Sequence, residues 1–300
     1  MTGNSASLTT NFPSFADGKL IDLNANSGGI HVGNGVPTTV DNTAITDNSV
    51  TTKGLLGEPL DFDPAMIVGD SQLTMSNSII SGNTLSATLA TTTDIGPAGS
   101  TLEIDGSGTI TNTRITDNTS TVVSPDGVAG NAGAGLAASG TGLVTVRGGV
   151  ISDNTATAKT STGSATVEAV GVLSDSLLEL DGVQVSGNTG TATGPTGTAQ
   201  GGGIWNGVEF AGPQVQLTLD HTTVTHNSLS GSPGITVQGG GLFTTLPVTL
   251  HNSVIAGNTP DQCFGCTGGT ANAAEPGTSG ASARASARAQ EGSGPSWPGR

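Results

Sequence analysis

The residues best suited to chemistry in this chain of 300 residues are three carboxylates at matching positions of neighbouring segments. Glu179 and Asp181 are two residues apart, so in an extended strand both side chains point to the same face. Asp220 holds the position of Asp181 in the segment that follows. Glycoside hydrolysis needs two carboxylates on one face, roughly 5–9.5 Å apart. These three residues are therefore the candidate catalytic residues of a polysaccharide-degrading enzyme.

Some polysaccharide-degrading enzymes also need a basic residue or a bound metal ion beside the carboxylates. A polysaccharide lyase needs a basic residue beside a bound calcium ion, but Arg114 and Arg147 stand at different positions of adjacent segments. Calcium prefers oxygen ligands, which Asp61, Asp63 and Asp70 offer around one loop. The calcium-binding nonapeptide of β-helices is absent, so no cofactor is expected and calcium is the open alternative.

The histidines and cysteines have simpler interpretations. His221, His226 and His251 fall at three different positions of their segments, which is typical of solvated imidazoles rather than of a metal site. Cys263 and Cys266 are the only cysteines, and a zinc site would need two further ligands. We expect them to form a disulfide at the end of the repeat, which suits an oxidising compartment.

A repeat must position these residues. Asparagines recur at intervals of 31 to 39 residues, a period typical of a stacked repeat protein. They are Asn48, Asn83, Asn118, Asn154, Asn188, Asn227 and Asn258. Asparagine tolerates left-handed backbone geometry, and stacked side-chain amides can bond to one another from coil to coil. The asparagines are therefore predicted to form a structural ladder.

The residues before each asparagine predict short strands. Apolar residues stand three and eight positions before it, and usually also ten before it, which is strand periodicity with one face buried. A third short strand follows glycine, most clearly at 201–206 and 239–243. Three such strands cannot bury a core alone, but stacked units can. The chain is thus predicted to be all-β: one right-handed parallel β-helix of about seven coils with three short strands per coil.

Two surface features follow from the same alignment. The extra length of each coil comes just after the asparagine, as at 120–132 and 190–200, and is expected to form loops on one side of the rod. Such loops are either a binding side or simply solvated. An outward threonine column stands nine residues before the asparagines, interrupted by Glu179, and is either a solvent-facing ladder or a surface for ice or sugar. Its members are Thr39, Thr74, Thr109, Thr145, Thr218 and Thr249.

The repeat sets the expected domain limits. Residues 1–27 match it poorly and are expected to form an N-terminal cap or partial coil. Residues 28–266 form the β-helix, and residues 267–300, rich in Ala, Ser, Gly and Pro, form a disordered tail.

Composition excludes several functions. The formal charge is −15, which opposes binding to nucleic acid or to anionic membranes. No apolar run is long enough for a transmembrane segment, and the first residues show no signal peptide. A monomer is expected.

The chain resembles the right-handed parallel β-helix repeat proteins of bacterial surfaces, which are similar to polymorphic outer-membrane protein repeats. The resemblance rests on residues 201–206, 217–227 and 254–263 and covers about 28–266. It implies a pectate-lyase-like superfamily fold and an extracellular or cell-surface location. The function expected is a non-enzymatic stalk or adhesion module that binds polysaccharide or a cell-surface protein. The alternative is a polysaccharide-binding or polysaccharide-degrading protein.

Overall fold

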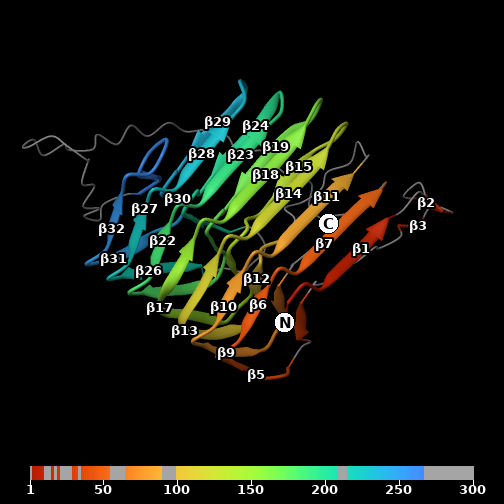
Figure 1. Cartoon of the computed structure of the whole chain (residues 1–300). Helices are drawn as coiled ribbons and strands as arrows, with labels where there is room; N and C mark the ends of the chain where they lie inside the picture. Colours follow the sequence, from red (N-terminus) through yellow and green to blue (C-terminus); the bar gives the residue numbers. More distant parts are fainter. Residues whose placement is uncertain are drawn as a thin grey trace, which may run out of the picture.

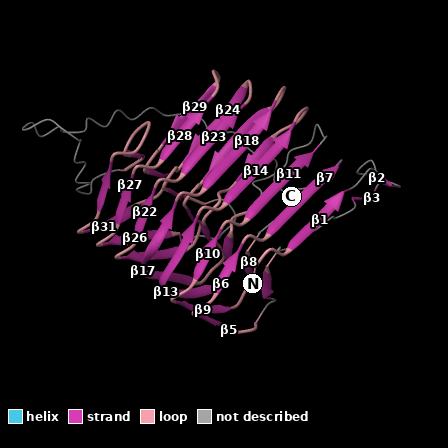
Figure 2. Cartoon of the chain, viewed as in Figure 1, coloured by secondary structure: helices cyan, strands magenta, loops and turns pink. Residues whose placement is uncertain are grey.

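The computed structural model describes residues 2–9, 15–16, 19–20, 29–32, 35–54, 65–89, 99–208 and 215–266. These residues form a parallel β-solenoid of about six turns, and the described part contains no helix (Figures 1 and 2). The number of turns is thus slightly lower than the seven coils expected. The all-β prediction is confirmed.

The widest sheet carries the strands that lead up to the asparagines. Each of its coils turns a corner between two short strands, or bends within one long strand. This twelve-stranded sheet contains β5 (Thr38–Asp41), β6 (Ala44–Thr46), β9 (Gln72–Ser76), β10 (Ile79–Ser81), β13 (Ser107–Thr116), β17 (Leu143–Ser152), β21 (Leu177–Asp181), β22 (Gln184–Ser186), β26 (Gln216–Asp220), β27 (Thr223–Thr225), β31 (Val248–His251) and β32 (Val254–Ala256).

A second sheet contains the short strands that come earlier in the repeating units, five of which follow glycine. This eight-stranded sheet contains β4 (Ile30–Val32), β8 (Met66–Val68), β12 (Leu102–Ile104), β16 (Leu136–Ala138), β20 (Val172–Ser174), β25 (Ile204–Asn206), β30 (Leu242–Thr244) and β33 (Cys263–Phe264). The core lies between the two sheets, where residues such as Ile45, Ile80 and Ile115 stack in register and are almost fully buried.

The segments after the asparagines are strands, and the expectation of loops there is wrong. They build a seven-stranded sheet of β1 (Ser5–Thr9), β7 (Ser49–Gly54), β11 (Thr84–Leu89), β14 (Thr119–Ser124), β18 (Thr155–Thr160), β23 (Thr189–Thr193) and β28 (Ser228–Gly231). Four coils add a further strand, giving a four-stranded sheet of β15 (Ala129–Asn131), β19 (Ser164–Glu168), β24 (Thr196–Gln200) and β29 (Ile235–Gln238).

These two sheets pack face to face along one side of the solenoid, where Figure 1 shows their strands side by side. We call this two-layer part the fin. Its core is separate from the main core and consists mostly of small residues, including Ala129, Ala156, Ala158, Ala165, Val167, Ala192 and Ala199. These segments form strands because threonine alternates with alanine or glycine. Every second residue can then be buried between the two sheets without a bulky side chain. The extra length does collect on one side, as expected, and it adds strands to the three predicted per coil.

The ends of the chain are only partly described. Residues 5–9 extend the seven-stranded sheet as β1, and β2 (Phe15–Ala16) pairs with β3 (Lys19–Leu20) in an antiparallel hairpin. The predicted tail, 267–300, lies outside the described residues. Among the residues that are described, no helix is long and apolar enough to cross a membrane.

Candidate functional site

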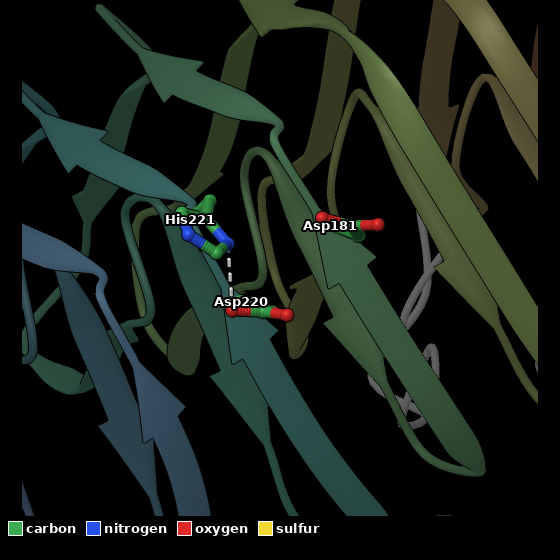
Figure 3. Close-up of side chains that lie close together, drawn as sticks. All are labelled: Asp181, Asp220 and His221. Carbon is green, nitrogen blue, oxygen red and sulfur yellow. Dashed lines mark ion pairs between the residues drawn. The ribbon is translucent and has the colours of Figure 1, made fainter.

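Two of the candidate carboxylates meet a histidine on the outer face of the twelve-stranded sheet. Asp181 ends β21 and Asp220 ends β26, and the two are register partners in parallel strands. The Nδ1 atom of His221 lies 2.8 Å from Oδ1 of Asp220. One ligand atom from each of the three residues lies within 4.8 Å of the others. Figure 3 shows the three side chains close together. We call these three residues the Asp-Asp-His cluster.

The position of His221 follows from the corner that ends β26. Its backbone has a φ of 47°, in the left-handed region that favours glycine and asparagine. The equivalent corner in other coils holds Asn42, Asn77, Asn112 and Asn252, or Gly148 and Gly182. Histidine therefore replaces a turn residue, and its imidazole comes beside the carboxylate that precedes it.

The chemistry open to this cluster is limited by solvent. Two carboxylates and an imidazole are a donor set that a divalent transition metal accepts, and Asp220 can also orient the imidazole of His221 as a base. The side chains of His221 and Asp220 are 63% and 37% exposed, so water screens their attraction. The cluster is an open polar surface rather than an enclosed site.

The remaining neighbours extend this surface. Glu179 lies two residues before Asp181 on β21 and aligns with Thr145 and Thr218. The three predicted carboxylates thus share one face, as the alternation required. Arg147 aligns with Asp181 from the coil before. The surface therefore mixes both signs of charge.

The other predicted residues are dispersed. Arg114 aligns with Ile79 and Val150, a different column from that of Arg147. His251 aligns with Asp220 on the side away from Asp181. His226 has a φ of 57° and holds the corner just before a ladder asparagine. That corner holds Asp47, Asp117 and Asp153 in three other coils, all with left-handed φ, so the aspartates there serve the turn.

The predicted calcium ligands do not form a described site. Asp61 and Asp63 lie outside the described residues. Asp70 lines an open hollow of about 370 Å³ together with Asp105 and Thr141. In this hollow Oδ1 of Asp105 accepts a hydrogen bond from the Ser139 hydroxyl at 2.8 Å. None of the residues that line the hollow belongs to the Asp-Asp-His cluster.

The asparagines form a continuous buried ladder. The backbone N–H and the Nδ2 of each asparagine donate to Oδ1 of the next, as Asn154 does to Asn188 at 3.1 and 2.9 Å. From Asn83 onward Nδ2 also donates to a carbonyl of the coil before, as from Asn154 to Ile115 at 3.1 Å. The seven side chains are at most 5% exposed. Their polar atoms are used in holding one coil to the next.

The ladder has two members that the asparagine spacing did not identify. At one end, the backbone N–H and Nδ2 of Asn4 donate to Oδ1 of Asn48 at 3.1 and 2.9 Å. At the other end, Oε1 of Gln262 accepts from the backbone N–H and Nδ2 of Asn258 at 2.9 and 3.1 Å. Asn4 is 44 residues before Asn48, outside the regular period. Gln262 is a different residue type, so no asparagine pattern could reveal it.

A second, partial ladder runs five residues before the asparagines, where the sequence shows short side chains. The Thr222 hydroxyl accepts from the Val183 backbone N–H at 3.3 Å, and the Ser253 hydroxyl accepts from the Thr222 N–H at 3.0 Å. The Ser78 hydroxyl accepts from Thr43 in the same way. Hydroxyls therefore satisfy backbone donors at this corner.

The last turn is closed by several interactions close together. Cys263 and Cys266 form a disulfide, and Phe264 between them stacks on Phe243 with ring centroids 5.4 Å apart. The Asp261 carboxylate accepts from the backbone N–H of Gly239 at 3.0 Å. Burial raises the pKa of Asp261, and backbone hydrogen bonds from Gly239 and Gly240 oppose that rise.

One further acidic residue has an unusual environment. Glu168 ends β19 in the fin and aligns with Gln200, which donates through Nε2 to Oε1 of Gln238 at 3.1 Å. Loss of solvent around the carboxylate raises the pKa of Glu168 to about 7. It lies in the four-stranded sheet, apart from the Asp-Asp-His cluster.

These features define the class of the protein: a parallel β-solenoid held together by an internal asparagine ladder. Comparison of the chain with protein-family models, curated proteins and solved structures finds no match.

Proposed function

We propose that the protein is a non-enzymatic, exported or cell-surface β-solenoid that acts as a rigid stalk or adhesion module. The observation that carries this proposal is the continuity of the side-chain ladder from Asn4 to Gln262. Each coil is bonded to the next through side chains as well as backbone, and this stiffens a rod. A rigid rod presents surfaces at a fixed spacing, and this is what a stalk or adhesion module requires.

The disulfide supports the proposed location. Cys263 and Cys266 are bonded, and disulfides persist in oxidising compartments rather than in the cytosol. We also propose that the protein is related to polymorphic outer-membrane protein repeats and has a pectate-lyase-like fold. The proposed partner of this monomeric solenoid is a polysaccharide or a cell-surface protein.

A polysaccharide-degrading function is the second candidate, and one observation favours it. Asp181 and Asp220 bring ligand atoms within 4.8 Å of each other, close to the separation of about 5 Å in retaining glycosidases. Calcium binding would accompany a lyase.

Two experiments separate these candidates. Surface proteins of intact cells can be released by brief protease treatment and identified by peptide mass spectrometry. Our proposal predicts peptides of this chain in the released fraction, and recovery only after lysis would contradict it. Purified protein is also tested for depolymerisation of acidic and neutral polysaccharides. Turnover that is lost in the Asp181→Asn and Asp220→Asn double variant would establish the second candidate instead.

A further inference from the structure

The outer face of the seven-stranded sheet carries a two-dimensional array of hydroxyl side chains. In each of six strands, the first and third residues are threonine or serine, and both columns stay in register from strand to strand. We call these residues the hydroxyl array: Ser49, Thr51, Thr84, Ser86, Thr119, Thr121, Thr155, Thr157, Thr189, Thr191, Ser228 and Ser230.

The array is open to solvent while the residues between its members are buried. Every member is half-buried or exposed, as expected of side chains that stack on their neighbours. The intervening residues, such as Leu85, Ala156 and Leu229, face the inner layer and are nearly inaccessible. The four-stranded sheet packs on that inner side and supports the array from behind at β14, β18, β23 and β28.

The spacing of the array is regular in two directions. Neighbouring strands of a sheet lie about 4.8 Å apart, and residues two apart on a strand lie about 6.7 Å apart. The strands from β7 to β28 run side by side (Figure 1). Their residues pair in one register from strand to strand. Hydroxyls and threonine methyls therefore repeat on a near-rectangular net over six strands.

The other broad face of the solenoid lacks this regularity. There the threonine column is interrupted by Glu179, and the column two residues further on holds Arg147, Asp181, Asp220 and His251. Charged side chains of different lengths disrupt a flat surface and hold strongly ordered water of their own. The two columns of the hydroxyl array contain no charged residue. The next outward column of the same sheet holds Lys53 and Lys159 beside Thr88, Val123 and Thr193, so the array ends there.

We propose that the hydroxyl array binds ice. Oxygen atoms on the prism faces of hexagonal ice repeat at distances similar to those two spacings, so water ordered by the array can join the lattice of a crystal. A protein partner would need an apolar centre with aromatic anchors, and the array has neither. The array contains no aromatic ring on which a sugar chain could stack. A crystal surface can match the array over its whole area, because the surface also repeats in two directions.

The test compares ice growth in solutions of the full chain and two double variants. Thr121→Lys with Thr157→Lys places two long charged side chains in the middle of the array. Thr74→Lys with Thr109→Lys is the matched control, because these exposed threonines lie on the twelve-stranded sheet. Thermal hysteresis and inhibition of ice recrystallisation are measured, with circular dichroism and thermal unfolding as checks of the fold.

We expect the unmodified chain and the control variant to inhibit recrystallisation and the array variant to lose that inhibition. If the array variant does not fold, Thr121→Ser with Thr157→Ser removes only the methyl groups and should weaken the effect. No effect of the unmodified chain on ice overturns the proposal, as does equal loss in the control variant. Binding to insoluble cellulose or chitin that depends on Thr121 and Thr157, without any effect on ice, would also overturn it.

Discussion

Gln262 takes the place of an asparagine beside Asn258. Its Oε1 accepts from the backbone N–H and Nδ2 of Asn258 at 2.9 and 3.1 Å, as Oδ1 of the next asparagine does elsewhere. Its own Nε2 donates to the Asn258 carbonyl at 3.2 Å. The last coil thus satisfies the buried donors of the ladder with a residue only four positions further along the chain.

This relationship predicts a local effect of Gln262→Ala. The backbone N–H and Nδ2 of Asn258 would lose their acceptor, which costs about 1 kcal/mol where water can enter. Amide hydrogen exchange should therefore accelerate in β32 and remain unchanged in the central coils. Gln262→Glu keeps an acceptor oxygen and serves as the control. If the alanine and glutamate variants exchange alike in β32, Gln262 does not close the ladder.

The glycines that precede five strands of the eight-stranded sheet, β4, β16, β20, β25 and β30, predict a second effect. A Cβ on Gly203 would lie 2.5 Å from the Gly241 carbonyl oxygen and 2.8 Å from Nδ2 of Asn227. Because both neighbours are held by inter-coil hydrogen bonds, Gly203→Ala should lower the free energy of unfolding by about 1–3 kcal/mol. Chemical denaturation measures the loss.

Gly108→Ala is the comparison for that variant. Its nearest contact would be the Ile104 methyl at 3.2 Å, in a column where other coils have Leu73 and Val144. We expect a smaller loss of stability at Gly108 than at Gly203. Equal losses would mean that contact with the ladder is not what makes Gly203 necessary.

The raised pKa of Glu168 predicts a pH dependence of stability. In the unfolded chain this carboxyl ionises near 4.5, whereas in the folded protein its pKa is about 7. Between these values the unfolded state releases the proton that the folded state keeps, so stability falls as the pH rises from about 4.5 to 7 and is level above. Glu168→Gln should remove this part of the slope in thermal unfolding.

The Glu168→Gln variant also has a structural expectation. Gln200 and Gln238 already pair side chain to side chain in the same column, and the amide that replaces the Glu168 carboxyl would align with them. The burial that raises the pKa of Asp261 adds a slope of the same sign, so the comparison is between wild type and variant. An unchanged pH profile in the variant would show that Glu168 is not the group responsible.

Much of the scaffold is readable from the sequence because its positions repeat. The apolar columns, the ladder asparagines and the pairing of Asp181 with Asp220 all follow from aligning segments on one residue type. The fin is not predicted because its strands contain threonine, alanine and glycine, which resemble a loop in composition. Its only signal is alternation, as in residues 155–160, where Ala156 and Ala158 are buried.

The candidate site is less predictable for a physical reason. The closeness of His221 to Asp220 depends on a left-handed corner in which histidine replaces asparagine or glycine. Strand periodicity assigns His221 to a column but does not place its side chain beside Asp220. Closure of the ladder by Gln262 likewise depends on how the chain turns after Asn258, which has no repeated pattern.

The stability of Asn154→Ala tests most directly whether the asparagine ladder is scaffold rather than active site. Asn154 accepts from both donors of Asn118, bonds to Asn188 and Ile115, and is fully buried. Its loss strands several buried polar groups, so we expect the free energy of unfolding to fall by about 3 kcal/mol or more. The exposed Gln184→Ala in the same region should change it by less than about 0.5 kcal/mol. Wild-type stability without the Asn154 side chain would show that the ladder does not hold the coils together.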